Sequence, residues 1–435
     1  MKRRTLQLLL LTLLSSSGAM AQVNCSSGPT TQKLVCEFPI STGVLTNASA
    51  LGSTSGASSG AATALQAATT LNIAVATQVS QLPMASASSG TLVVHDKNGA
   101  AHTINDLGPI LTDRAQTIGK NRFFLGATAS QFVFTDIDGN SLGNLKFAFY
   151  RTAYNPATGA VLTNTYTSDT TRIDFRINQF IGVATWGLTD TLDLSVIVPV
   201  ERVSIGAYTG APTPATKTTS YVLDANNKFL FQYDTSPTYA FGSASGVGDI
   251  TVNGKSIMWK GERAAVSAAM NFRLPTGDKL NLLGSGAFGL NPYLAYSYQA
   301  KVSPHAKVGY QWNTRTVLNN PTLTFGGNKA LPGGMQYDIG VDYAIKKQLT
   351  IAGDLLGNQY LNTPRLNTTT VKITDTISVP TSTPGTSSYW ISNVSTGLKW
   401  NPVGNLVLSG NVLFQLIDNG LRSRPTPLVG IAYRF

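Results

Sequence analysis

The feature that most constrains this sequence is a regular alternation of apolar and polar residues through the greater part of the chain. Leu192, Leu194 and Val196 alternate with Asp193 and Ser195, and the same period of two recurs further along. A β-strand produces this period because its successive side chains point to opposite sides. No uninterrupted apolar run reaches the roughly 20 residues that a membrane-spanning helix needs. We therefore predict that this part of the chain forms amphipathic strands.

The alternation predicts about twelve strands between Lys120 and Phe435. Their centres lie near Thr128, Phe180, Val198, Asn253, Ala268, Ser297, Tyr310, Val341, Asp354, Ser395, Asn411 and Ile431. Short connections are expected near Leu188, Gly261, Pro304, Lys347 and Val403, and mostly long, polar ones near Pro156, Ala225, Leu282, Ala330 and Asn367. Short periplasmic turns and long external loops are typical of outer-membrane barrels. The sequence thus predicts an all-β fold, a transmembrane antiparallel β-barrel.

Closure of the sheet follows from the surrounding lipid, because backbone donors and acceptors cannot face hydrocarbon unpaired. Only 12% of the residues are charged, about half the ~25% usual for soluble proteins.

The last strand places Val429, Ile431, Tyr433 and Phe435 on one face, and this ending resembles the insertion signal of bacterial outer-membrane barrels. We therefore expect the barrel-assembly machinery, outer-membrane lipid and lipopolysaccharide to be partners of the chain.

The first residues resemble an export signal, with basic residues at positions 2–4, an apolar stretch and small residues up to Ala21. This pattern predicts a signal peptide over residues 1–21. We expect the mature protein in the outer membrane of a Gram-negative type of envelope. An exported chain meets an oxidising environment, so Cys25 and Cys36 are predicted to form a small disulfide loop.

Residues 22–119 form a distinct N-terminal segment before the predicted barrel, which spans residues 120–435. The spacing of apolar residues predicts one helix over Ala61–Leu82. A hairpin turn at Asn98-Gly99 is also predicted, which would place His95 opposite His102. We expect this segment to plug the lumen or to cap it from the periplasmic side, and a flexible tether is the alternative.

If the apolar faces meet lipid, the opposite faces line the lumen, where charged groups must be paired or hydrated. Such residues form either a salt-bridge network within the wall or the lining of a polar conduit or binding cavity. A tight turn at Gly187–Asp190 would also make Arg176 and Glu201 cross-strand neighbours. The predicted lumen-lining residues are Arg172, Asp174, Arg176, Asp193, Glu201, Asp249, Lys255, Arg273, Lys307, Asp338, Asp342 and Asp354.

The sequence offers no good location for a catalytic site, which would need a nucleophile, a base and an orienting group within reach of one another. His95 and His102 precede the predicted barrel, and His305 is expected at a periplasmic turn beside Pro304. We therefore predict no enzymatic activity, no cofactor and no metal. The formal net charge of +11 favours anionic partners, and export makes these lipopolysaccharide phosphates or anionic solutes rather than nucleic acid.

Three short motifs stand out in the predicted barrel: Gly246–Ile250, Phe272–Asp278 and Asn281–Gly284. Three further segments support them: Thr117–Lys120, Ile137–Gly139 and Gly420–Arg422. Together they resemble the outer-membrane transporter family catalogued under the meta-pathway of phenol degradation, over about Lys120 to Phe435. The resemblance implies uptake of small hydrophobic or aromatic molecules, by analogy with channels for long-chain fatty acids and aromatic hydrocarbons, and it assigns no catalytic residues.

The barrel pattern and this resemblance together predict a passive outer-membrane transporter for small hydrophobic or aromatic solutes. One alternative is a general diffusion porin. Another is a structural or surface-interaction barrel, in which the long segments Tyr150–Asp169 and Tyr208–Ser245 would make the contacts.

Overall fold

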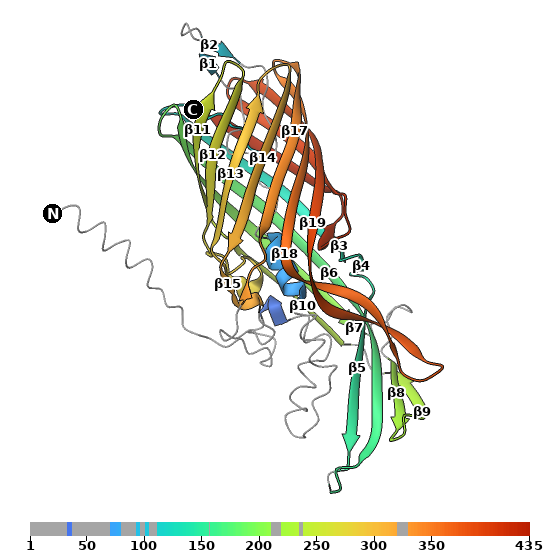
Figure 1. Ribbon diagram of the computed structural model, residues 1–435. Helices are drawn as coiled ribbons and strands as arrows, with labels where there is room; N and C mark the ends of the chain where they lie inside the picture. Colours follow the sequence, from blue (N-terminus) through green and yellow to red (C-terminus); the bar gives the residue numbers. More distant parts are fainter. Residues whose placement is uncertain are drawn as a thin grey trace, which may run out of the picture.

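The computed structural model describes residues 33–36, 70–79, 93–95, 101–103, 111–155, 157–209, 219–234, 238–319 and 329–435. Twelve strands form a closed antiparallel barrel, and the last pairs with the first (Figure 1). Each predicted strand centre falls within one of them, so the predicted fold is confirmed. In order around the barrel they are β3 (Phe123–Ile137), β6 (Val161–Gly187), β7 (Leu192–Thr209), β11 (Thr251–Lys260), β12 (Ala264–Arg273), β13 (Gly289–Tyr298), β14 (Val302–Asn313), β17 (Gly334–Lys346), β18 (Leu349–Lys372), β19 (Ser378–Val403), β20 (Leu406–Gln415) and β22 (Thr426–Arg434).

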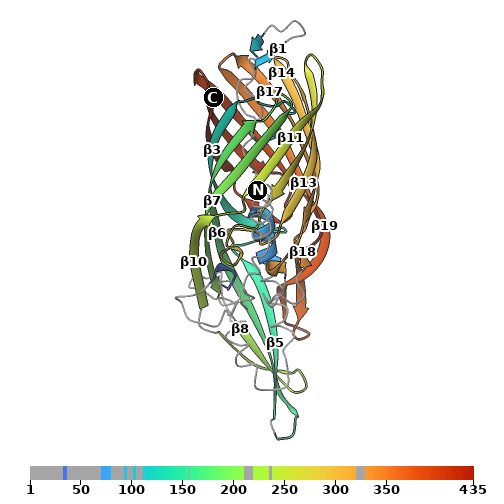
Figure 2. The same ribbon diagram turned by 90° about the vertical axis from the view of Figure 1, so that its left-hand side faces the viewer.

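The two ends of the barrel differ in their connections. The short turns β6–β7, β11–β12, β13–β14, β17–β18 and β19–β20 lie at the same end as the C-terminus, and the longer connections lie at the other end (Figures 1 and 2). Because short turns are periplasmic in outer-membrane barrels, the C-terminal end faces the periplasm and the opposite end faces outward.

Several strands continue beyond the barrel at the outer end. There β5 (Leu145–Tyr154) and β8 (Thr219–Asp224) pair with the outer half of β6, and β9 (Phe229–Asp234) pairs with β8. The β18–β19 hairpin also extends outward and packs on this sheet through an apolar cluster around Leu223, Ile373 and Val379. The predicted long loop near Asn367 is therefore wrong, because Asn367 pairs with Thr383 inside the hairpin. Burial of the hairpin tip in this cluster stabilises the pairing of β18 with β19 beyond the barrel.

One position in the barrel is shared by two consecutive strands. β10 (Thr238–Val247) pairs with the outer part of β7, and β11 continues beside the same strand after a break at residues 248–250. The shorter elements are η1 (Leu34–Cys36), β1 (Val93–His95), β2 (Ala101–Thr103), β4 (Asn140–Ser141), η2 (Lys279–Asn281), β15 (Arg315–Thr316), η3 (Val317–Asn319), β16 (Lys329–Ala330) and β21 (Leu421–Ser423).

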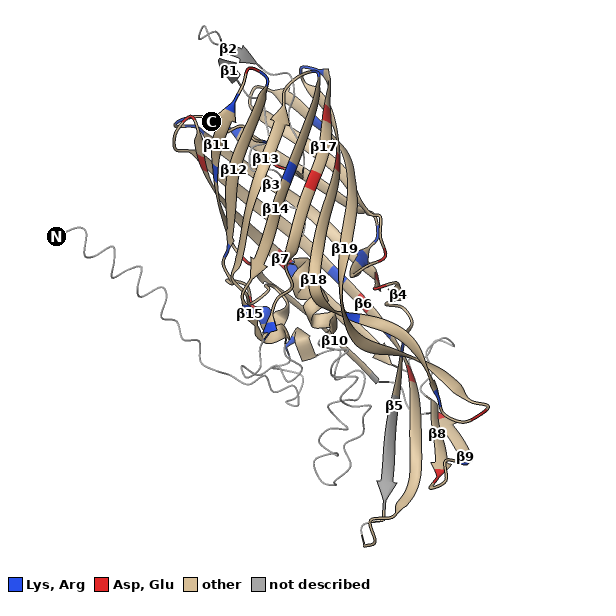
Figure 3. Ribbon diagram, viewed as in Figure 1, with Lys and Arg blue, Asp and Glu red and all other residues tan. Residues whose placement is uncertain are grey.

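The wall alternates as a membrane barrel requires. On β7, Leu192, Leu194 and Val196 are exposed on the outer face, whereas Asp193 and Ser195 are buried inside. Charged positions are sparse along the middle of the strands and more frequent towards both ends (Figure 3). The outer face of the barrel therefore suits hydrocarbon, and its interior suits polar groups.

The N-terminal segment is described in part. Residues 70–79, which lie within the predicted helix Ala61–Leu82, are helical. Among the described helices, none has both the length and the apolar character to cross a membrane. The predicted hairpin forms as β1–β2, but its register is shifted by one residue: His102 pairs with Val94 and not with His95, so the predicted opposition of the two histidines is wrong.

The predicted signal peptide and Cys25 lie outside the described residues. Cys36 is buried, and no described cysteine has a free thiol. The pairing of Cys25 with Cys36 stays a prediction.

Candidate functional site: the barrel lumen

Helix 70–79 lies inside the barrel, towards its outer end (Figures 1 and 2). Its Ile73 and Val75 are 0% and 1% exposed, and the polar Thr70 and Thr77 are buried as well. A surface helix keeps one polar face in water, so a helix buried all round is enclosed by other parts of the chain. It belongs to one apolar cluster with inward-facing residues of the wall, among them Phe175. Protein therefore fills this part of the lumen.

This filling explains why three predicted lumen residues lie elsewhere. On the outer half of β6, Phe175 and Ile177 are buried inside, whereas Arg172, Asp174 and Arg176 lie on the outer face. The prediction for these three residues is wrong because the strand has passed the membrane here. Outside it is water rather than lipid, and inside it is the apolar helix.

The other predicted residues lie on the inner face. Lys307 is partly exposed there, and the remaining eight, Asp193, Glu201, Asp249, Lys255, Arg273, Asp338, Asp342 and Asp354, are buried. The predicted pairing of Arg176 with Glu201 is wrong: Arg176 lies opposite Ser204, and Glu201 lies opposite Gln179. The Gln179 side-chain amide donates a hydrogen bond to Glu201 Oε1 at 2.8 Å.

A second N-terminal element, residues 111–119, is named here the crossing segment and lies in the lumen near its periplasmic end. Lys255 Nζ on β11 pairs with Asp113 Oδ1 at 3.2 Å. The Tyr293 hydroxyl on β13 donates to Asp113 Oδ2 at 2.7 Å. Further along the segment, the Ile118 N–H donates at 2.9 Å to Oδ2 of Asp193 on β7, which lies opposite Lys255 in the sheet. Three barrel strands thus hold the crossing segment through side chains that point inward.

His305 contacts two buried carboxylates inside the barrel, Asp342 and Asp354. The prediction that His305 lies at a periplasmic turn is wrong. That turn lies between Tyr298 and Val302, so His305 is already on β14 with its side chain buried in the lumen. Its Nε2 lies 2.8 Å from Asp354 Oδ1, and its Nδ1 lies 3.5 Å from Asp342 Oδ2. The imidazole therefore bridges carboxylates on two neighbouring strands, β17 and β18.

A cavity of about 150 Å³ lies between helix 70–79 and the crossing segment. A cavity of this volume holds a molecule about the size of benzene. Its larger apolar lining residues are Leu111, Phe132, Leu356, Ile391 and Leu413.

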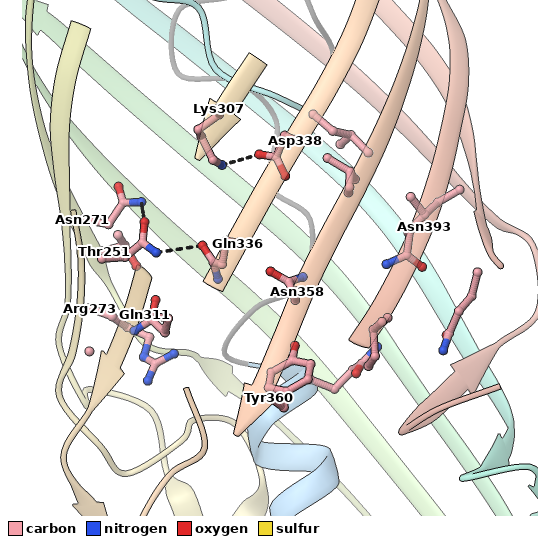
Figure 4. Close-up of a pocket in the computed structure, with 18 of the residues that line it drawn as sticks. Thr251, Asn271, Arg273, Lys307, Gln311, Gln336, Asp338, Asn358, Tyr360 and Asn393 are labelled. Atoms are coloured by element: carbon pink, nitrogen blue, oxygen red, sulfur yellow. Dashed lines mark hydrogen bonds and ion pairs between the residues drawn. The ribbon is translucent and has the colours of Figure 1, made fainter. Parts of the chain in front are cut away.

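The rest of the wall consists mainly of side-chain amides, among them Asn271, Gln336, Asn358 and Asn393, together with Lys307, Asp338, Arg273 and Tyr360 (Figure 4). Lys307 Nζ pairs with Asp338 Oδ2 at 2.5 Å, so these two charges neutralise each other beside the cavity. The Asn291 amide donates to Gln336 Oε1 at 2.8 Å. The cavity wall therefore mixes apolar and hydrogen-bonding groups: Leu356 lies opposite Asn393, and Asn358 lies opposite Ile391. Sequence reasoning missed the amides because it searched only for charged residues.

A second cavity, of about 450 Å³, lies at the periplasmic end. It is lined by the end of the crossing segment, residues 116–119, and by the β11–β12 turn. Leu111, at the other end of the same segment, lines the inner cavity. The crossing segment therefore borders both cavities.

Three of the sequence motifs come together at the outer end of the barrel. Asp249, at the break between β10 and β11, accepts hydrogen bonds from the Gly277 N–H at 3.1 Å and from the Ser285 N–H at 2.8 Å. The Thr276 hydroxyl donates to the Gly248 carbonyl at 2.7 Å. These contacts fold the loop of residues 274–288 inward, and Leu282 and Leu283 join the apolar cluster around helix 70–79. The motifs thus build a loop that covers the lumen.

The start of the described chain contacts this same loop. Lys33 Nζ pairs with Asp278 Oδ2 at 3.2 Å, and the Leu34 N–H donates to Asn281 Oδ1 at 3.4 Å. Partial burial raises the pKa of Asp278, but hydrogen bonds and the charge of Lys33 outweigh it and lower this pKa overall. Asp278 therefore stays ionised at neutral pH, and the pair with Lys33 is lost only as the pH falls through that lowered pKa.

Residues 164–360 match the family model described as "Putative MetA-pathway of phenol degradation". No curated protein matches the chain. An outer membrane channel from Pseudomonas putida F1 is 13% identical, with a TM-score of 0.43, over 74% of this chain and 98% of that one. A FadL homologue from Pseudomonas aeruginosa is 9% identical, with a TM-score of 0.28, over 72% and 90% of the two chains.

The toluene transporter TbuX from Ralstonia pickettii is 11% identical, with a TM-score of 0.25, over 76% of this chain and 94% of that one. The assignment of the fold rests on the closed strand pairing described above and not on these likenesses. The three motifs that meet at Asp249 fall inside the matched residues 164–360. The predicted resemblance is therefore confirmed over that range: this chain is an outer-membrane β-barrel that resembles the phenol-degradation family from β6 to β18.

Proposed function

We propose that this protein is a passive outer-membrane transporter for small hydrophobic or aromatic compounds. The observation that carries the proposal is the inner cavity of about 150 Å³, with its apolar lining residues, inside a barrel that spans the membrane. Contact with a small aromatic ring instead of water is favourable for an apolar side chain such as Phe132 or Leu356, because it removes apolar surface from water. The side-chain amides in the cavity wall favour compounds that also carry a hydroxyl or carbonyl oxygen.

The proposal includes a division of the chain into a signal peptide over residues 1–21, an N-terminal plug over residues 22–119 and the barrel over residues 120–435. Helix 70–79 and the crossing segment support a plug because both are buried in the lumen. A general porin keeps a water-filled channel instead. In this view a solute passes only when the crossing segment moves, and the segment's position beside both cavities makes it the gate between them.

Uptake must be measured across a lipopolysaccharide leaflet, because small aromatic compounds cross simple phospholipid bilayers unaided. The protein is expressed in Gram-negative cells that lack their own channels for hydrophobic compounds, and the initial uptake of radiolabelled toluene and phenol is recorded. The expected result is faster uptake of both compounds, with unchanged uptake of a hydrophilic sugar of similar size. Equal uptake with and without the protein would refute the transport proposal.

One observation favours a general diffusion porin as a second candidate: the loop of residues 274–288 folds into the barrel, as a constricting porin loop does. Exclusion of neutral polymers in planar bilayers separates the two candidates. A stable, water-filled pore that admits sugars would support the porin. Absence of any solute flux would leave the surface-interaction alternative, in which the outer sheet of β5, β8 and β9 makes the contacts. No catalytic role is proposed for the interior residues.

A further inference from the structure

The outer wall of the barrel changes from apolar to basic within two rows of paired residues. Phe180 on β6 lies directly opposite Val200 on β7, and Val200 lies opposite Val247 on β10. In the other direction Phe180 lies opposite Ala129, and Ala129 lies opposite Val429. On β7 the exposed apolar face spans residues 192–200, about the 9–11 residues with which a strand crosses hydrocarbon. The last apolar pair on β6 and β7, Phe180 with Val200, therefore lies at the outer border of the hydrocarbon layer.

The next two rows outward hold three arginines and no acidic residue. Arg202 lies opposite Asn178, one row beyond Phe180. Arg176 lies opposite Val133 in the row after that. Arg424 joins the same row, because its N–H donates to the Val133 carbonyl at 2.9 Å from the other side of β3. Arginines on neighbouring strands therefore meet in one patch directly above the lipid.

These arginines have no counter-charge within the described part of the chain. Arg176, Arg202 and Arg424 are exposed, and their side chains make no ion pair or hydrogen bond with a described residue. Further from the membrane the arrangement differs: Arg172 pairs with Asp174 at 3.0 Å, and Arg422 pairs with Asp418. Arg172 and Arg422 on the same wall are thus neutralised, whereas the three arginines nearer the lipid are not.

The three positions are close enough to act on one ligand. Directly opposite side chains in antiparallel strands are about 5 Å apart at Cβ, and diagonal neighbours about 7–8 Å. Arg176 and Arg202 are diagonal neighbours, and Arg424 reaches the patch across the single strand β3. Like charges at these separations repel each other, so a bound anion would stabilise the patch.

We propose that Arg176, Arg202 and Arg424 bind the phosphate groups of lipid A, the phosphorylated glycolipid of the outer leaflet. Its phosphates lie directly above its acyl chains, which is the level of the two rows above Phe180 and Val200. Guanidinium groups match phosphate geometry through two parallel hydrogen bonds. Asn178 and Gln131, in the same row as Arg202, add neutral groups that suit the sugar hydroxyls. This site lies on the outer wall and is independent of transport through the lumen.

The test measures binding of diphosphorylated lipid A to the purified full-length protein by native mass spectrometry. Dephosphorylated lipid A with the same acyl chains is measured in parallel. The variant R176Q/R202Q/R424Q is compared with wild type and with the charge-matched control K301Q/K346Q/K347Q, whose lysines are exposed at the periplasmic turns. Heat-modifiable migration in gels reports whether each barrel is folded.

We expect wild type and control to prefer the diphosphorylated lipid. The arginine variant should lose affinity for it on the order of 100-fold. Each of the three replaced residues contributes about 1 kcal/mol at an anionic membrane surface, and each 1.4 kcal/mol corresponds to about tenfold in affinity. Equal binding of the diphosphorylated lipid by wild type and by the folded arginine variant would overturn the proposal. If the variant does not fold, the wild-type arm decides, because a site for phosphate cannot bind the two lipids equally well.

Discussion

Lys255 Nζ on the barrel wall lies 3.2 Å from Asp113 Oδ1 on the crossing segment, and the two side chains are only 2% and 12% exposed. This pair joins the N-terminal segment to the wall across 142 residues of sequence. Removal of one partner of a buried ion pair leaves the other charge without compensation, at a cost of about 3–5 kcal/mol. The pair is therefore the contact whose loss should most directly release the crossing segment.

We predict that Lys255→Met raises ion conductance through the barrel, because the ion pair that joins Asp113 to β11 is then lost and the crossing segment leaves its position. Single-channel recording in planar bilayers measures the change. The double variant Lys255→Met with Asp113→Leu replaces the pair by apolar groups and should restore the closed state at least in part. A single variant that conducts like wild type would show that the pair does not hold the segment in place.

Filling the inner cavity should block uptake. Leu356 faces the cavity, whereas Leu355 faces lipid opposite the exposed Ile339, so the strand itself supplies a matched control. We expect Leu356→Trp to abolish most uptake of phenol and toluene in cells, and Leu355→Trp to leave it unchanged. If both variants transport at the wild-type rate, solutes do not pass through this cavity.

The motif glycines are predicted to matter because of close packing. A Cβ atom at Gly277 would lie 2.4 Å from the Leu283 carbonyl oxygen, so the loop must shift. Forced shifts of this kind cost about 1–3 kcal/mol. Gly277→Ala should therefore lower the free energy of unfolding, measured by urea titration in lipid vesicles. At Gly254 a Cβ meets nothing within 4 Å, and Gly254→Ala should be neutral or slightly stabilising; equal effects of the two substitutions would contradict this account.

The pairing of Lys33 with Asp278 predicts which side of the membrane the N-terminal segment reaches. Asp278 lies in a loop at the outer end, so Lys33 should react with a membrane-impermeant amine reagent on intact cells. Lys260, at the periplasmic β11–β12 turn, should react only after the outer membrane is permeabilised. Peptide mass spectrometry measures both, and Asp278→Asn should increase labelling of Lys33 because the ion pair is lost. Labelling of Lys33 only in permeabilised cells would place this segment on the periplasmic side.

The wall of the barrel was predictable because lipid imposes a simple rule on every strand that crosses it. Phe180 had to face outward and Asp193 inward at the level of the hydrocarbon, and both do. The rule holds only at that level. Beyond it, the inner face of β6 stays apolar while the outer face becomes polar. This change on the outer face, between Phe180 and Asn178, was the signal that Arg172, Asp174 and Arg176 lie outside.

The predicted position of His305 at a periplasmic turn is wrong for a different reason. Pro304 suggested a turn, but a proline inside a barrel strand is tolerated where its missing N–H is not needed for the ladder. Pro304 lies opposite Val341 in a continuous pairing of β14 with β17. Only the register of that pairing shows that His305 reaches Asp342 and Asp354.

The sequence alone determined that this chain is a twelve-stranded outer-membrane barrel. The absence of long apolar runs excludes membrane-spanning helices, and the period of two indicates strands, which cross lipid only as a closed barrel. It also placed buried charges such as Lys255 and Asp354 on the inner face. Only the tertiary structure decided what the lumen contains: the burial of helix 70–79, the contact of Asp113 with Lys255 and the cavity beside Leu356. These join residues more than a hundred positions apart, and alternation along a strand says nothing about which distant segment fills the space that the strands enclose.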